Sequence, residues 1–170
     1  MDKFMVKNIL ALTLCLLTTS GYAAVPVKTD INVEAEVSTS VRIYVEGKDV
    51  TDGSFGVKLE DKNGYMSAIT PPFYFIGNAS TVSIKLSGPK ALTSTEGNLM
   101  NVSTLYVDKS SNSGVSTAFP YNNIAVFSSL ATVPSSYNGP MISFKSTDKT
   151  EVIPLGKYSG TYTLTVTPST

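Results

Sequence analysis

Apolar and polar side chains alternate with a period of two along most of the chain after residue 30, and a helical period is almost absent. Because successive side chains of a strand point to opposite faces, this pattern predicts β-strands that each bury one face. The final run is the clearest, with Tyr158, Gly160, Tyr162, Leu164 and Val166 expected on one face. Further strands are predicted at 31–37, 41–45, 55–59, 73–76, 81–86, 99–107, 124–127, 141–144 and 151–153.

Turn-forming residues separate these runs at short intervals. The pair Asn63-Gly64 is the best candidate for a tight hairpin turn, because both residues tolerate positive φ. The polar stretch 108–114 is expected to be a loop. Short strands at this spacing, with no repeat and no domain linker, predict a single all-β sandwich domain.

The N-terminus has the features of a secretory signal peptide over residues 1–23. Lys3 and Lys7 give a basic start, residues 8–17 are mostly apolar, and a polar stretch ends at Ala23, the expected cleavage position. The apolar run is too short to span a bilayer. Cys15 follows the bulky Leu14, which disfavours a lipid anchor. The sequence therefore predicts an exported protein.

Removal of residues 1–23 takes away the single cysteine, so the exported chain is expected to depend on its core and strand pairing alone. The chain has no histidine, one arginine (Arg42), and equal numbers of acidic and basic residues, 13 each. These features argue against histidine-based catalysis, Cys/His metal sites and nucleic acid as a partner. No cofactor is expected.

Catalysis has little support in the sequence, and no catalytic residue is assigned. Serines and threonines are abundant, but no convincing base accompanies them. A glycosidase needs two carboxylates flanking a sugar, and Asp108 with Glu151 could supply them only if the fold brought them together. Solvated surface carboxylates are the simpler interpretation. A secreted hydrolase thus remains a weak alternative.

The segment 27–37 allows two interpretations. Its apolar positions share one strand face, and Asn32, Glu34 and Glu36 occupy the other. It can be a first strand of its own domain, with 38–40 as a turn, since sequential strands usually pair. It can also be a donor strand that completes the sheet of a neighbouring molecule. The apolar positions are Val27, Ile31, Val33, Ala35 and Val37.

Both ends of the chain resemble the major subunits of the CFA/I-type (class 5, alternate chaperone–usher) fimbriae. Those subunits open with Val-x-Lys-x-Ile-x-Val-x-Ala-x-Val, which residues 27–37 match at the five apolar positions, with Thr29 in place of the lysine. They end with Gly-x-Tyr-Ser-Gly and an alternating strand, as in the stretch from Gly156 to Gly160 and the residues after it. Relatives often carry Asp-Pro after the first run, where Ser38-Thr39 stand here.

The resemblance implies an immunoglobulin-like β-sandwich that lacks a strand and is completed by the donor strand of a neighbouring subunit. Residues 24–38 would form the donor extension, and 39–170 the pilin domain. The five apolar positions would fill the groove of the next subunit, and Tyr162, Leu164 and Val166 would line the acceptor groove. Each side chain could contribute about 1.5–3 kcal/mol by burial.

The implied function is that of a structural major subunit of an adhesive fimbria on the bacterial surface. Its expected partners are identical subunits in a head-to-tail filament, a periplasmic chaperone, an outer-membrane usher and a tip adhesin, with a host receptor as a further candidate. The alternative is a secreted monomeric β-sandwich that binds a glycan or a host protein. The two differ in whether the domain 39–170 lacks a strand.

Overall fold

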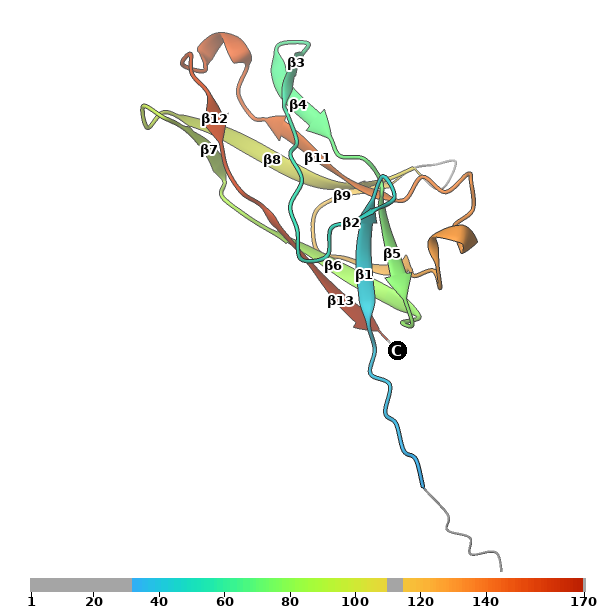
Figure 1. The fold of residues 1–170 in the computed structure, drawn as a ribbon. Helices are drawn as coiled ribbons and strands as arrows, with labels where there is room; N and C mark the ends of the chain where they lie inside the picture. Colours follow the sequence, from blue (N-terminus) through green and yellow to red (C-terminus); the bar gives the residue numbers. More distant parts are fainter. Residues whose placement is uncertain (1–31, 110–114, 170) are drawn as a thin grey trace, which may run out of the picture. The chain divides into compact units, whose positions relative to one another are not determined.

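The computed structural model describes residues 32–109 and 115–169 (Figure 1). The chain divides into two units, Met1–Glu36 and Val37–Thr170. The expected signal peptide and the positions Val27 and Ile31 lie outside the described residues. In the second unit the described strands and 3-10 helices are β1 (Val41–Val45), β2 (Lys48–Asp49), β3 (Glu60–Lys62), β4 (Tyr65–Ile69), β5 (Phe73–Gly77), β6 (Thr81–Ser87), β7 (Ala91–Ser94), β8 (Leu99–Asp108), β9 (Val115–Thr117), β10 (Tyr121–Ala125), η1 (Leu130–Thr132), β11 (Pro140–Ser146), η2 (Thr150–Val152), β12 (Tyr158–Ser159) and β13 (Thr163–Ser169).

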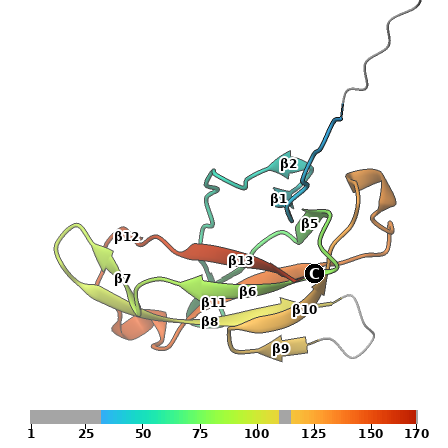
Figure 2. The ribbon, with the colours of Figure 1, turned by 90° about the horizontal axis from the view of Figure 1, so that it is seen from below.

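The strands form three antiparallel sheets, which confirms the all-β prediction. Their orders are β2-β1-β5, β10-β6-β13 and β12-β7-β8-β11-β4-β3, with β9 added on β8. The longest pairing joins β8 to β11 in continuous register from Pro140 opposite Asp108 to Ser146 opposite Val102. Viewed from below, β1 and β5 lie on the opposite side of β6 and β13 from β8 and β9 (Figure 2). The sheets therefore enclose a core between layers.

The core gathers side chains from β5, β6, β8 and β11. Phe75, Val82 and Ile84 are almost completely buried. Tyr106 is fully buried, stacks on Tyr121 with ring centroids 3.8 Å apart, and donates a hydrogen bond to Asp108 Oδ2 at 2.8 Å. Its burial and this hydrogen bond raise the pKa of the Tyr106 hydroxyl. The hydroxyl stays protonated and satisfied inside an otherwise apolar core.

The structure confirms the predicted tight turn at Asn63-Gly64. Both residues have positive φ, 58° and 79°, and they connect β3 to β4 with Lys62 opposite Tyr65. A two-residue turn of this kind matches the twist of a hairpin. The Gly64 amide also donates to Asp61 Oδ1 at 2.9 Å. Local chemistry therefore determined this hairpin.

Besides the N-terminal segment, whose described part has no regular structure, two predicted strands do not form. Residues 55–59 form no strand, although Val57 and Leu59 pack against the core and Lys58 between them is exposed. Residues 151–153 overlap the 3-10 helix η2 rather than a strand. There, Thr150 donates from its side chain to Asp61 Oδ2 at 2.7 Å and from its amide to Gly64 at 2.9 Å. These bonds hold the segment as a turn against the β3–β4 hairpin.

Other boundaries also differ from the prediction. The final run is divided into β12 and β13, and the strand expected at 124–127 is displaced to β10. The strands β2, β3, β4, β7 and β9 are additional. In β4 the sequence does not alternate, since four of its five residues are at least half-buried on one face or the other. A period of two is visible only where one face meets water.

Candidate functional site at the free edge of β13

Among the described strands, the last one, β13, has a partner along only one of its edges. It pairs with β6 in continuous register from Thr163 opposite Ser87 to Ser169 opposite Thr81. It is the terminal strand of its sheet in the part of the chain that the structure describes. A seven-residue edge without a partner presents a row of backbone donors and acceptors to any added strand.

The register indicates which residues face this free edge. The Ser169 carbonyl accepts a hydrogen bond from the Ser80 amide at 3.1 Å, on the side of β6. Because backbone groups alternate along an antiparallel ladder, residues of the other parity face outward. Pro168 belongs to that outward set, as expected for a residue without an N–H. Leu164 and Val166 share this set and therefore offer their backbone amides and carbonyls to the free edge.

The same two residues direct their side chains toward the core. Leu164 and Val166 are half-buried and pack against the core, whereas Thr163, Thr165 and Thr167 are exposed. This is the alternation that the sequence predicted. An apolar face that is only half covered, next to an unpaired edge, can bury more surface when a further strand is added.

Tyr162 begins this face, and its ring is restrained by contacts with Phe144, Pro89 and Gly88. Its ring lies 5.1 Å from the Phe144 ring in an edge contact, and its hydroxyl donates to the Pro89 carbonyl at 2.8 Å. Partial burial raises its pKa. A Cβ at Gly88 would collide with the ring, reaching 2.7 Å from Cε1, so this position needs glycine. Tyr162 is therefore a rigid end to the row formed with Leu164 and Val166.

The edge of β1 is less open. Val41 and Ile43 are half-buried and pack against the same core. However, the Val50 amide donates to the Ile43 carbonyl at 2.8 Å, and the Ile43 amide donates to Thr51 Oγ1 at 2.9 Å. Tyr44 pairs with β2. These contacts cover the β1 edge from Ile43 onward and leave β13 as the longer free edge.

The segment 53–59 lies between β2 and β3 in the sequence and is drawn without an arrow (Figure 1). Its residues Val57 and Leu59 pack against the core as a strand would. Among the described residues, no backbone hydrogen bond joins 54–59 to a neighbouring strand. The segment therefore has the apolar spacing of a strand but no strand neighbour among the described residues.

The described part of the N-terminal segment forms no strand. Residues 32–40 lack regular structure and are exposed, with Val33 86% and Val37 82% accessible to solvent. Ala35 is exposed as well. Isolated apolar residues on a surface are common, but a clean alternation of them is a strand pattern. The described part of the chain therefore contains a strand-like segment that pairs with no strand, and a strand edge to which no strand is paired.

The pairing of Asp108 with Glu151 that a glycosidase would need does not occur. Asp108 stands at one end of the β8–β11 ladder, opposite Pro140, and η2 follows the other end, where Ser146 faces Val102. Six residues of strand separate these ends by about 20 Å. In residues 32–109 and 115–169 there is no group of three or more acidic, His or Cys side chains able to hold a metal. No described helix is long and apolar enough to cross a membrane.

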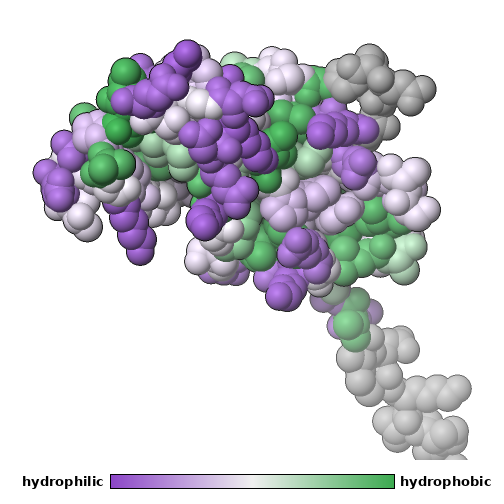
Figure 3. Space-filling model, turned by 90° about the horizontal axis from the view of Figure 1, so that it is seen from above, coloured by the Kyte–Doolittle hydropathy of each residue, from purple (hydrophilic) through white to green (hydrophobic). Residues whose placement is uncertain are grey.

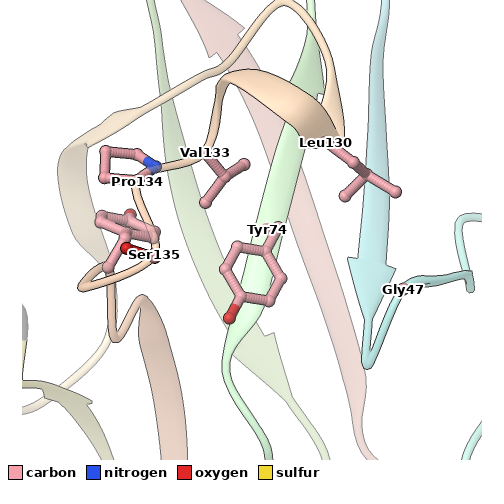
Figure 4. Close-up of a pocket in the computed structure, with 7 residues that line it drawn as sticks. Gly47, Tyr74, Leu130, Val133, Pro134 and Ser135 are labelled. Atoms are coloured by element: carbon pink, nitrogen blue, oxygen red, sulfur yellow. The ribbon is translucent and has the colours of Figure 1, made fainter.

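A second candidate site is a surface pocket of about 240 Å³ beside β5 and η1 (Figure 4). Tyr74 extends into it from β5, and Leu130 and Val133 approach from the η1 loop. Tyr137 completes the wall, with its ring 6.0 Å from Tyr74 and 5.0 Å from Phe127. Burial, Asp108 and Tyr74 raise the pKa of Tyr137 to about 12. The lining is uncharged, which suits a small neutral ligand.

The surface near β3 and η2 is mainly polar, with separate apolar patches (Figure 3). Leu155 and Val152 are the most exposed large apolar residues of this region, at 95% and 72%. Neither was singled out from the sequence. Apolar residues scattered in this way are normal for a protein surface and define no site by themselves.

Comparisons with known proteins carry no functional argument for this chain. No protein-family model matches the sequence, and no curated protein matches it. Among solved structures, the chain is similar to a chain from work on a chaperone–tip adhesin complex described as vital for synergistic activation of CFA/I fimbriae biogenesis. The identity is 15% and the TM-score 0.47, over 76% of this chain and 42% of that one. The geometry of the chain itself must therefore carry any functional conclusion.

Proposed function

We propose that this protein is a structural subunit, the major shaft pilin, of an adhesive bacterial fimbria assembled by donor-strand exchange. The observation that carries the proposal is the complementarity of two unpaired features of one chain. The segment 32–37 has a strand pattern but no ladder, and β13 has a free edge flanked by the half-buried Leu164 and Val166. The segment 32–37 can pair with the free edge of β13 either in a neighbouring molecule or by folding back onto its own domain.

In a filament, Val33, Ala35 and Val37 of one subunit would fill the row beside β13 of the next, with Val27 and Ile31 extending the contact. Tyr162, Leu164 and Val166 would line the acceptor side. The contact joins two different surfaces and does not close, so repetition yields a filament rather than a ring or dimer. The role is structural, and it requires no catalytic residue or cofactor.

The unpaired edge also explains the partners that we propose. Exposed apolar core and free backbone groups favour aggregation. A periplasmic chaperone would cover the edge first, an outer-membrane usher would oversee its replacement by the next subunit, and a tip adhesin would end the filament. The protein would be exported and would reside in a fimbria on the cell surface.

A sizing experiment on residues 24–170 tests the proposal. The chain should form concentration-dependent polymers. Val33→Asp, which places a charge on the inserted face, should abolish them, because a buried unpaired carboxylate is strongly unfavourable. Asn32→Asp introduces the same group on the opposite face and should leave polymers intact. A stable monomer that is indifferent to added peptide 25–38 would contradict the proposal.

The second candidate function is a secreted monomeric domain that binds a glycan or a host protein. The uncharged pocket formed by Tyr74, Tyr137, Leu130 and Val133 is the observation in its favour. Aromatic rings and hydroxyl groups together suit a neutral sugar. Tyr137→Ala should then abolish glycan binding by a monomer that forms no polymers under any condition.

A further inference from the structure

We propose that Asn78 is a positioning residue that clamps the chain at Ser38–Ser40 and so makes a stiff joint between successive subunits. The inference rests on the proposed function and concerns the point at which the donor segment ends and the domain begins. Asn78 follows β5, at the corner that leads into β6. No feature of the sequence marked it for this role.

The clamp consists of three hydrogen bonds to the residues just before β1. The Ser40 amide donates to Asn78 Oδ1 at 2.7 Å, and Asn78 Nδ2 donates to the Ser38 carbonyl at 3.1 Å. The Asn78 amide donates to the Ser40 carbonyl at 3.1 Å. The side-chain amide thus contacts two backbone groups at once, and only a group with both a donor and an acceptor can do so.

Gly77 makes this close approach possible. It lies opposite Val41 in the β1–β5 ladder, and its amide donates to the Phe127 carbonyl at 2.9 Å. A Cβ at this position would collide with the Ser40 carbonyl and would lie 2.9 Å from Val41 Cα. Glycine therefore allows residues 40–41 to approach β5 closely, within reach of Asn78.

The position of the clamp in the sequence gives it a consequence for the filament. Ser38 is held by its own domain, and Val37, directly before it, is the last of the apolar donor positions. When the donor segment is inserted, no free residue would remain between the inserted strand of one subunit and the clamped chain of its own domain. Because each extended residue spans only about 3.3–3.6 Å, the linking chain would be too short to let two neighbouring domains move far relative to each other.

The backbone of Ser38-Thr39 has no proline to stiffen it, and the clamp supplies the stiffness from outside. Serine and threonine leave φ free, unlike proline. Bonds from Asn78 on either side of Thr39 restrict the same dihedral angles. Because hydrogen bonds from Asn78, and not a proline ring, fix these backbone angles, replacing Asn78 should make the joint flexible.

Two variants test the joint. Asn78→Ala removes both side-chain bonds, and Gly77→Ala moves Ser40 away while keeping Asn78. Asn101→Ala is the matched control, since the Asn101 side-chain amide lies on β8 and donates to Asp148 Oδ2 at 3.5 Å, in the loop after β11. Each is made in residues 24–170 and in a monomeric form that carries Val33→Asp.

In the monomer, amide hydrogen exchange at Ser40 is expected to accelerate about tenfold in Asn78→Ala, as loss of one net hydrogen bond implies. In filaments, electron microscopy should give a shorter persistence length for Asn78→Ala and Gly77→Ala, but not for Asn101→Ala. If Asn78→Ala leaves amide exchange at Ser40 unchanged, or accelerates it without changing filament stiffness, the proposed joint is wrong. A parent chain that forms no filaments would overturn the proposed function instead, whatever the exchange at Ser40 shows.

Discussion

The half-buried state of Val166 allows a prediction that separates strand addition from simple stability. Val166→Thr keeps the shape and strand preference of the side chain but adds a hydroxyl on the face toward the core. In the fragment 39–170 that hydroxyl can still reach water, since the site is only half covered. The fragment should therefore fold, with a modest loss of stability.

Binding of the donor peptide 25–38 would bury that position. A valine gains about 1.5–3 kcal/mol on full burial, so about 1 kcal/mol remains to be gained when the strand is added. An unpaired hydroxyl costs about 1 kcal/mol or more on burial. The sum, about 2 kcal/mol, corresponds to a peptide Kd about thirtyfold weaker.

The matched control is Thr165→Val, one residue away on the exposed face of the same strand. Its peptide Kd should change by less than about threefold, since surface substitutions have small effects. Fluorescence anisotropy of a labelled peptide gives both constants, and urea unfolding of each fragment confirms that it is folded. Equal Kd values for the two variants, or weaker binding by Thr165→Val, would refute the assignment of faces on β13.

Three further outcomes test other parts of the structure. Tyr162→Phe removes the hydroxyl bond to a backbone carbonyl and should lower the free energy of unfolding in urea by about 1 kcal/mol. Gly64→Ala places a side chain at φ 79° and should destabilise by about 1 kcal/mol in the same assay, whereas Gly56→Ala, where a Cβ meets open space, should not. Hydrogen bonds from Thr51, with a further bond from Arg42, lower the pKa of Asp49 to about 2. A carboxylate whose pKa is lowered in the folded state stabilises the fold at pH values above its unfolded pKa. This small stabilisation should be lost as the pH falls from about 4 to about 2. Asp49→Asn should remove that part of the pH dependence of unfolding.

The strands with one solvent-exposed face were predictable from their alternation, whereas β4, which is largely covered on both faces, was missed. The runs that became β1, β6, β8 and β13 alternate because water solvates one side, so their period survives in the sequence. Four of the residues 65–69 are at least half-buried, and the sequence shows no period there. The turn at Asn63-Gly64 was predictable because two residues alone determine its geometry.

The segment 55–59 shows where a local pattern is insufficient. It has the alternation of a strand, but a strand also needs a neighbour to receive its backbone hydrogen bonds. No residue pattern reports whether that neighbour exists. The clamp by Asn78 was unpredictable for a similar reason, since it joins positions 38 residues apart through the β5–β6 corner.

Mixing two defective chains tests the head-to-tail contact most directly. Residues 24–170 with Val33→Asp lose the donor face but keep the acceptor edge, whereas the same chain with Val166→Asp keeps the donor and loses the acceptor. Each variant alone should be monomeric, and a mixture should give a dimer of one chain of each kind on a sizing column with light scattering. Controls with Asn32→Asp and Thr165→Asp should still polymerise. A mixture that stays monomeric, while each variant remains folded, would contradict strand exchange between subunits and would indicate that the N-terminal segment completes its own domain.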